Sequence, residues 1–143
     1  MCRTPPLLYW RLARANGWLL DVGRSMKILM YHYVRPLESS RYPALKGRHV
    51  RDFQGQLAYL RKHFHLCSPT ELFDCLRAGE PVPKTWALLT FDDGYADHFR
   101  YVFPSLLEAK TSAFFFPPVS VVTQRRLLDV NKIHFVIAAA PSS

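Results

Sequence analysis

Two short apolar runs, separated by segments with helical patterns, constrain the fold more than any other feature of this sequence. Residues 86–91 form a run that is too short for a typical helix and is bounded by Pro and Gly. Residues 27–34 form a similar apolar and aromatic run. Such runs are typical of strands that are buried on both faces of a parallel sheet. Strands that alternate with helices predict an α/β fold.

The segments between the runs carry helix signals. A recurrence at steps of four and three residues places one apolar set on a single helix face: Phe53, Leu57, Leu60 and Phe64. The next helix, over residues 69–78, has a complete set of boundary residues: Ser68 as N-cap, Pro69, Glu71 in a capping box and Gly79 at the end.

The second half of the chain continues the alternation. Helical spacing is present over residues 99–107, where Pro104 is expected to kink the helix or begin a second piece. Residues 111–116 are a third strand candidate. A closing helix is expected after Asp129, with one apolar side toward the core: Val130, Ile133, Val136 and Ile137.

The net charge of +8 lies at the front of the chain, because residues 1–51 hold ten basic and two acidic residues. Nucleic acid, an anionic membrane surface and a phosphorylated glycan carrier are partners that such a front could meet. The basic residues are dispersed rather than clustered, so ordinary solvated charge is the favoured interpretation and no nucleic acid is expected. A steep salt dependence of nucleic-acid binding would be needed to revive that alternative.

Composition also bounds the location of the protein. Three cysteines form neither a disulfide framework nor a CxxC knuckle, which favours a reducing compartment. No apolar stretch is long enough to span a membrane, and no secretory signal is evident. We expect a cytoplasmic protein, at most peripheral to a membrane. We also expect residues 1–25 to be an extension outside the fold, with Met26 as a start of its own, and residues 138–143 to be an unstructured tail.

Adjacent carboxylates carry the chemistry. Asp92 and Asp93 follow directly on the run at residues 86–91, and the carboxyl edge of a parallel sheet is where ligands gather in α/β folds. Two neighbouring carboxylates beside an apolar strand repel each other unless a cation or a shared proton compensates them. Gly94 allows a sharp turn behind them. On its own, Asp-Asp-Gly is also a common surface turn.

Several segments in the same order resemble the polysaccharide deacetylases, carbohydrate esterases with a NodB homology domain. Thr90-Phe91-Asp92-Asp93-Gly94-Tyr95 resembles the first motif of that family. Residues 29–34 resemble its opening strand, and residues 111–115 resemble the strand after the first motif. The resemblance covers roughly residues 26–137 and corresponds to the N-terminal part of the family's domain.

The resemblance implies a distorted (β/α) barrel that removes N-acetyl groups from amino sugars with the help of a divalent metal, most commonly zinc. It gives Asp92 the role of the general base and Asp93 the role of a metal ligand. An N-acetylated glycan or a lipid-linked saccharide is the implied substrate. A metal suits this chemistry, since it lowers the pKa of a bound water and stabilises an oxyanion.

The sequence departs from the family after the first motif. The family's second motif supplies two further histidine ligands, whereas only His98 and His134 follow Asp93 here, and they are 36 positions apart. Truncation or a frameshift is the expected cause. The first expectation is therefore a deacetylase portion with little activity alone and weak zinc binding. The alternatives are a non-catalytic glycan-binding or regulatory module and a basic nucleic-acid-binding protein.

The remaining candidates have ordinary interpretations. His32 lies on the first strand, where a packed core position is expected and a place in the strand-end site is the alternative. His134 is expected at the surface or facing a partner. The cluster Phe114-Phe115-Phe116 is expected in the core rather than as a platform for sugar stacking.

Overall fold

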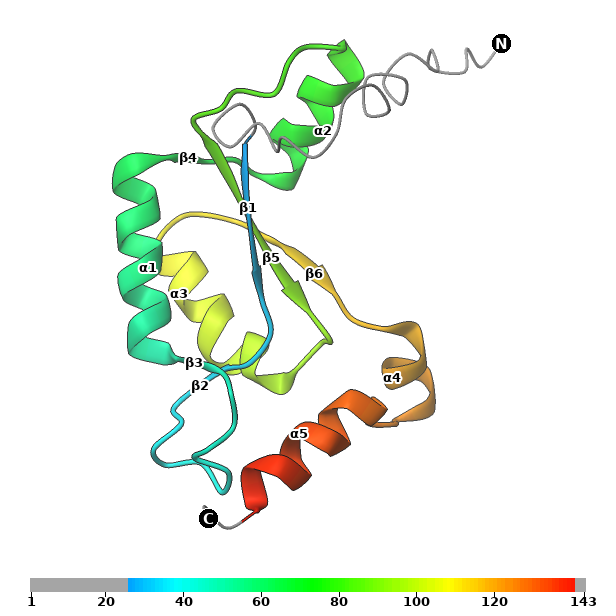
Figure 1. Ribbon diagram of the computed structural model, residues 1–143. Helices are drawn as coiled ribbons and strands as arrows, with labels where there is room; N and C mark the ends of the chain where they lie inside the picture. Colours follow the sequence, from blue (N-terminus) through cyan, green and yellow to red (C-terminus); the bar gives the residue numbers. More distant parts are fainter. Residues whose placement is uncertain (1–25, 141–143) are drawn as a thin grey trace, which may run out of the picture.

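The structure, a computed structural model, describes residues 26–140, and its centre is a four-stranded parallel sheet (Figure 1). The central strand β5 (Trp86–Asp92) pairs on one side with β1 (Lys27–Tyr31), in the register Lys27 to Ala87 and Tyr31 to Phe91. On its other side β5 pairs first with β4 (His65–Leu66) and then with β6 (Phe114–Phe116). The predicted α/β class is confirmed.

Helices connect these strands, and a small two-stranded parallel sheet lies below the main one in the view of Figure 1. The helices are α1 (Val50–His63), α2 (Pro69–Ala78), the π-helix η2 (His98–Val102), α3 (Phe103–Glu108), α4 (Val119–Gln124) and α5 (Asp129–Ala139). The small sheet consists of β2 (Val34–Arg35) and β3 (Arg48–His49). The second helical piece begins at Phe103 with Pro104 in its first turn, as predicted.

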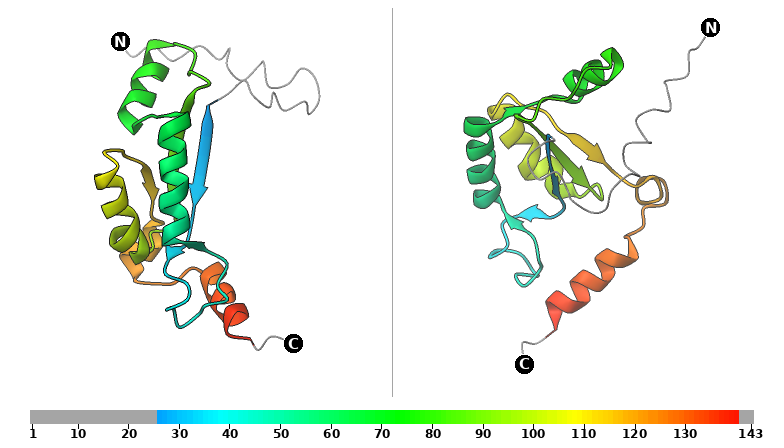
Figure 2. Two further views of the ribbon diagram at one scale, coloured as in Figure 1. Left: turned by 90° about the vertical axis from the view of Figure 1, so that its left-hand side faces the viewer. Right: turned by 45° about the horizontal axis from the view of Figure 1, so that its top comes forward.

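The core lies between one face of the main sheet and the two helices α1 and α3, which Figure 2 shows on the same side of the strands. Phe53, Leu57 and Leu60 of α1 are buried there, as the spacing predicts. Leu89 and Phe91 of β5 meet them, and Tyr31 stacks on Phe91 with ring centroids 5.2 Å apart. The packing fixes the end of β5 and therefore the position of the residues that follow it.

The opposite face of β1 corrects the expectation of a strand buried on both sides. Ile28 and Met30 are 62% and 61% exposed, and the burial along β1 alternates. In the described part of the chain β1 is an edge strand with helices on one face only, so every second side chain meets solvent. Residues 87–91 of β5, the central strand, are buried throughout, as predicted.

The capping prediction for α2 is confirmed in full. The Ser68 side chain accepts a hydrogen bond from the Glu71 backbone N–H, and the Glu71 carboxylate accepts one from the Ser68 backbone N–H. Gly79 closes the helix in the left-handed conformation with φ 72°.

The orientation predicted for α5 is wrong. The four apolar residues expected to face the core are exposed: Val130, Ile133, Val136 and Ile137. The side turned toward the rest of the chain carries Asn131, Phe135 and Ala138 instead. The inward side of α5 contacts tyrosines, and the ring centroids of Tyr42 and Phe135 are 4.9 Å apart. A polar and aromatic helix face is complementary to these tyrosines.

Three further observations bound the architecture. The strands of residues 26–140 form an open sheet and do not close into a barrel. Helix α5 continues through Ala139 and so includes the first two residues of the predicted tail, while residues 1–25 lie outside the described part. Among the helices of residues 26–140, none combines the length and the apolar character needed to cross a membrane.

Candidate active site at the carboxyl end of β5

The turn after β5 separates the two adjacent carboxylates. Asp92 is the last residue of the strand, while Asp93 and Gly94 both adopt positive φ, 69° and 65°. A Cβ on Gly94 would lie 2.8 Å from Cβ of Pro117, which follows β6. Glycine is therefore required both for the turn and for its contact with the neighbouring strand end.

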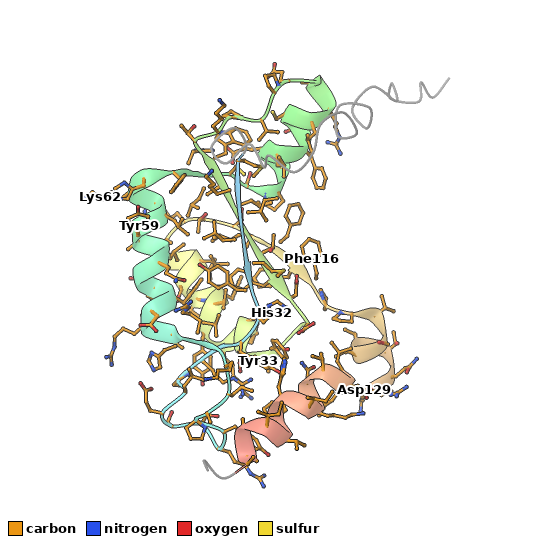
Figure 3. The ribbon with its side chains drawn as sticks, viewed as in Figure 1. His32, Tyr33, Tyr59, Lys62, Phe116 and Asp129 are labelled. Carbon is orange, nitrogen blue, oxygen red and sulfur yellow. The ribbon has the colours of Figure 1, made fainter. Side chains whose placement is uncertain are left out.

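Asp92 shares the strand end with His32. Because Tyr31 pairs with Phe91, the residues that follow them are neighbours across the sheet. His32 Nε2 lies 4.0 Å from Asp92 Oδ2, and the two side chains are 45% and 29% exposed. The expectation of a packed core histidine is wrong, since His32 reaches the sheet edge and is open to solvent (Figure 3).

Asp93 points to a different partner. The Tyr95 hydroxyl donates a hydrogen bond to Asp93 Oδ2 over 2.5 Å. Burial is the largest cause that raises the pKa of Tyr95 above its usual value, and the hydrogen bond to the Asp93 carboxylate adds to it. The phenol therefore keeps its proton at any physiological pH and remains a donor to Asp93.

A buried amide from α5 completes this side of the site. Asn131 is 3% exposed, and its Nδ2 lies 2.6 Å from the Tyr95 hydroxyl and 3.0 Å from the Tyr33 hydroxyl. The rings of Tyr33 and Tyr95 stack with centroids 4.3 Å apart. Figure 3 shows Tyr33 between the end of β1 and α5. The Tyr33 hydroxyl also lies 3.4 Å from Nδ1 of His134, whose predicted surface position is confirmed.

Sequence reasoning missed Tyr95 and Asn131 as parts of the site. Tyr95 belongs to the segment that resembles the family's first motif, but nothing in its spacing tells that its hydroxyl returns to Asp93. Asn131 is 36 residues from Tyr95 and 98 from Tyr33. The one available signal is a polar residue at a helix position that faces the protein.

A buried histidine and a largely buried ion pair lie near the turn. His98 is buried, and its Nε2 lies 2.8 Å from the His32 carbonyl oxygen, so Nε2 carries the proton that is donated. Desolvation is the largest cause that lowers the pKa of His98, which is therefore neutral. Arg35 donates to Asp97 over 2.6 Å, and these side chains are only 17% and 11% exposed.

Comparisons with solved structures find similar folds. IcaB from Ammonifex degensii matches with 36% identity and a TM-score of 0.55, over 66% of this chain and 39% of that chain. A de-N-acetylase from Aggregatibacter actinomycetemcomitans matches with 22% identity and a TM-score of 0.54, over 64% of this chain and 37% of that one. The deacetylase PplD of Streptococcus pyogenes, solved in complex with acetate, matches with 22% identity and a TM-score of 0.56, over 76% and 50%.

The fold of residues 26–140 is similar to part of the fold of these proteins. The chain spans about two fifths to one half of the length of these solved structures. No protein-family model matches it, and neither does any curated protein sequence. The predicted resemblance to polysaccharide deacetylases is thus confirmed for the fold.

The deacetylase fold implies a metal, and the residues described do not make a complete site for one. Within residues 26–140, no three side chains of His, Cys, Asp or Glu lie close enough together to hold a metal ion. Asp93 already shares Oδ2 with the Tyr95 hydroxyl. Two other candidates, Asp92 and His32, face each other across the sheet edge.

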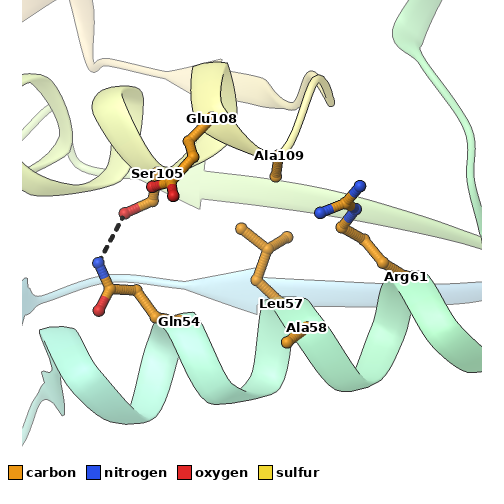
Figure 4. A pocket seen from close by; sticks show the side chains of 7 residues that line it. All are labelled: Gln54, Leu57, Ala58, Arg61, Ser105, Glu108 and Ala109. Carbon is orange, nitrogen blue, oxygen red and sulfur yellow. Dashed lines mark hydrogen bonds between the residues drawn. The ribbon is translucent and has the colours of Figure 1, made fainter.

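The surface beside the carboxyl end of β5 is hollowed. A hollow of about 360 Å³ adjoins His32 and is lined by Met30, Tyr31, His32, Tyr33, Lys46, Gly47 and Arg48. On the other flank Phe116 pairs in register with Asp92 and is 52% exposed. Phe115 is 39% exposed, so the expectation of a core position is wrong for both residues. A second cavity of about 330 Å³ lies between α1 and α3 and contains none of the site residues (Figure 4).

Proposed function

We propose that residues 26–140 form one part of a distorted (β/α) barrel that removes an N-acetyl group from an amino sugar. The observation that carries the proposal is the pairing of β1 with β5, which brings His32 and Asp92 together at the carboxyl edge of a deacetylase-like sheet. Catalytic groups of parallel α/β proteins gather at this edge. The likeness of the fold to deacetylases supports the assignment.

Asp92 is suited to the role of general base. Its side chain is 29% exposed, so a water molecule can reach it. Asp92 takes a proton from the water whose oxygen attacks the acetamide carbon. The C–N bond then breaks, the amine takes up a proton, and acetate and the free amino sugar are the products.

The surroundings of Asp92 fit a carbohydrate substrate. Phe116 offers a half-exposed ring directly beside the strand end, and the hollow next to His32 provides hydrogen-bond donors from Lys46 and Arg48. We infer that an N-acetylated glycan or a lipid-linked saccharide binds across this edge, with the phosphate of a lipid carrier as one partner for the two cations.

The metal expected for the family is zinc, and this chain supplies few ligands for it. Of the family's ligand set the sequence matches Asp93 alone. We therefore propose that the chain binds zinc weakly and has little turnover unless further ligands are supplied by a complementary segment.

A chimera tests the function. Residues 26–140 replace the matching half of PplD, and the release of acetate from an N-acetylated chito-oligosaccharide is measured. Asp92→Asn should lower the rate by roughly 10²- to 10⁴-fold, which is typical for loss of a general base. Glu108→Gln, the same chemical change at the cavity between α1 and α3, serves as the control and should leave the rate unchanged. An inactive chimera that folds and binds zinc would refute the proposal.

A glycan-binding protein without turnover is the second candidate. The exposure of Phe116 favours it, because stacking on an aromatic ring binds sugars without any catalytic group. Saturation-transfer NMR with a chito-oligosaccharide separates the two: binding that Phe116→Ala abolishes, with no acetate released by the chimera, would favour the second candidate.

A further inference from the structure

The numbers of donors and acceptors at Asp93, Tyr95 and Asn131 determine which group donates each hydrogen bond between them. The carboxylate of Asp93 only accepts hydrogen bonds, so the single proton of the Tyr95 hydroxyl is donated to it. The oxygen of Tyr95 must then accept from its other neighbour, Asn131. Asn131 therefore presents its amide NH₂, and not its carbonyl oxygen, to the tyrosine.

The same amide orients a second phenol. Its two hydrogens are both used, one toward Tyr95 over 2.6 Å and one toward Tyr33 over 3.0 Å. The Tyr33 proton is then free to point to Nδ1 of His134, 3.4 Å away. Two arms, or chains of hydrogen bonds, thus start at the Asn131 amide. One runs through Tyr95 to the Asp93 carboxylate, and the other runs through Tyr33 to His134.

We propose that Asn131 is a positioning residue for the deacetylase site and acts on Asp93 through Tyr95. The inference rests on the proposed function, to which it adds a residue from the far end of the described chain. Hydrogen-bonded partners of this kind fix the rotamer of a site carboxylate, and their loss typically lowers affinity or activity about 10- to 100-fold.

The orientation of α5 supports this role independently. The helix exposes Val130, Ile133, Val136 and Ile137, and it turns the buried Asn131 toward the strand end. Phe135 lies on the same inward side, with its ring centroid 6.1 Å from that of Tyr33. This packing holds α5 where the Asn131 amide can reach both phenols.

Three variants of the full chain test the inference by NMR of the Asp93 side chain. Tyr95→Phe removes the donor to Asp93, and Asn131→Asp replaces the amide NH₂ with a carboxylate that competes for the Tyr95 proton. Tyr33→Phe is the matched control, because it removes one hydroxyl from the same amide but leaves the arm to Asp93 intact.

We expect one Asp93 rotamer and one carboxyl carbon shift in the unmodified chain and in Tyr33→Phe. Rotamer averaging and a changed shift are expected in Tyr95→Phe and Asn131→Asp. A purely structural role would disturb Asp93 equally in both single-hydroxyl variants, and that result, or an unchanged Asp93 in Tyr95→Phe, would overturn the inference. The pair of hydroxyl deletions decides the matter even if Asn131→Asp does not fold.

The catalytic consequence is measured separately in the chimera with PplD. Tyr95→Phe should lower kcat about 10- to 100-fold and leave KM unchanged. An unchanged kcat in an active chimera would overturn the positioning role. A chimera that folds and binds zinc but has no activity would refute the proposed function instead, while the NMR result on the full chain still decides whether Asn131 orients Asp93.

Discussion

Replacement of Gly94 by alanine tests whether the turn between the carboxylates and β6 is as tightly built as the structure shows. Gly94 has φ 65°, which costs an alanine roughly 1–2 kcal/mol. The new Cβ would also lie 2.8 Å from Cβ and 3.1 Å from Cα of Pro117, and relieving such overpacking typically costs about 1–3 kcal/mol more. We expect Gly94→Ala to lower the free energy of unfolding by about 2–5 kcal/mol.

Two other glycines are matched controls. Gly79 has a similar φ of 72°, but a Cβ added there would meet no atom within 4 Å, so Gly79→Ala should cost only the backbone term of roughly 1–2 kcal/mol. Gly55 lies inside α1 with open space around it, so Gly55→Ala should stabilise by about 0.5–1 kcal/mol. Urea denaturation measures all three. Equal losses for Gly94→Ala and Gly79→Ala would refute the close contact with Pro117.

Three further predictions concern the groups around the site and the best-capped helix. Burial lowers the pKa of His98, so below pH 6.5 the unfolded chain binds a proton that the folded chain does not. The free energy of unfolding should therefore fall as the pH drops below 6.5, by at most ~1.4 kcal/mol per pH unit. Urea titrations at each pH would measure this fall, which should be less steep in His98→Gln. Asp97→Ala leaves Arg35 charged and largely buried, which should cost roughly 3–5 kcal/mol, whereas Arg35→Met with Asp97→Leu should cost less; calorimetric unfolding that finds the double variant worse would contradict this. Ser68→Ala should cost about 1 kcal/mol through the lost cap of α2, and an unchanged urea midpoint would show that the cap does not stabilise the fold.

The parts of the fold that follow from local chemistry could be predicted from the sequence. The capping box of α2, the break before Phe103 and the strand that leads into Asp92 all depend on residues within a few positions of one another. For the same reason the turn at Gly94 was predictable, since it needs only a glycine and a residue that tolerates positive φ.

The parts that were wrong depend on which surfaces have neighbours. An apolar run such as residues 27–34 predicts a strand, but its pattern does not tell whether a second layer covers it, and Ile28 and Met30 are exposed. Periodicity likewise identified α5 but predicted that its apolar side faces inward. In the structure the helix instead turns inward the amide of Asn131, which contacts two tyrosines. The contacts of Asn131 join residues far apart in sequence, and composition and spacing carry no information about them.

The central claim is that the two adjacent carboxylates, Asp92 and Asp93, have different roles. It is tested most directly by measuring the zinc content and the deacetylation rate of the PplD chimera with Asp92→Asn or Asp93→Asn. The account predicts that Asp92→Asn keeps its zinc but loses roughly 10²- to 10⁴-fold in rate, because the base is gone. It predicts that Asp93→Asn loses zinc and activity together, because an uncharged amide is a poorer ligand than a carboxylate. Near-full activity in Asp92→Asn, or loss of zinc from it, would contradict the assignment of these two residues.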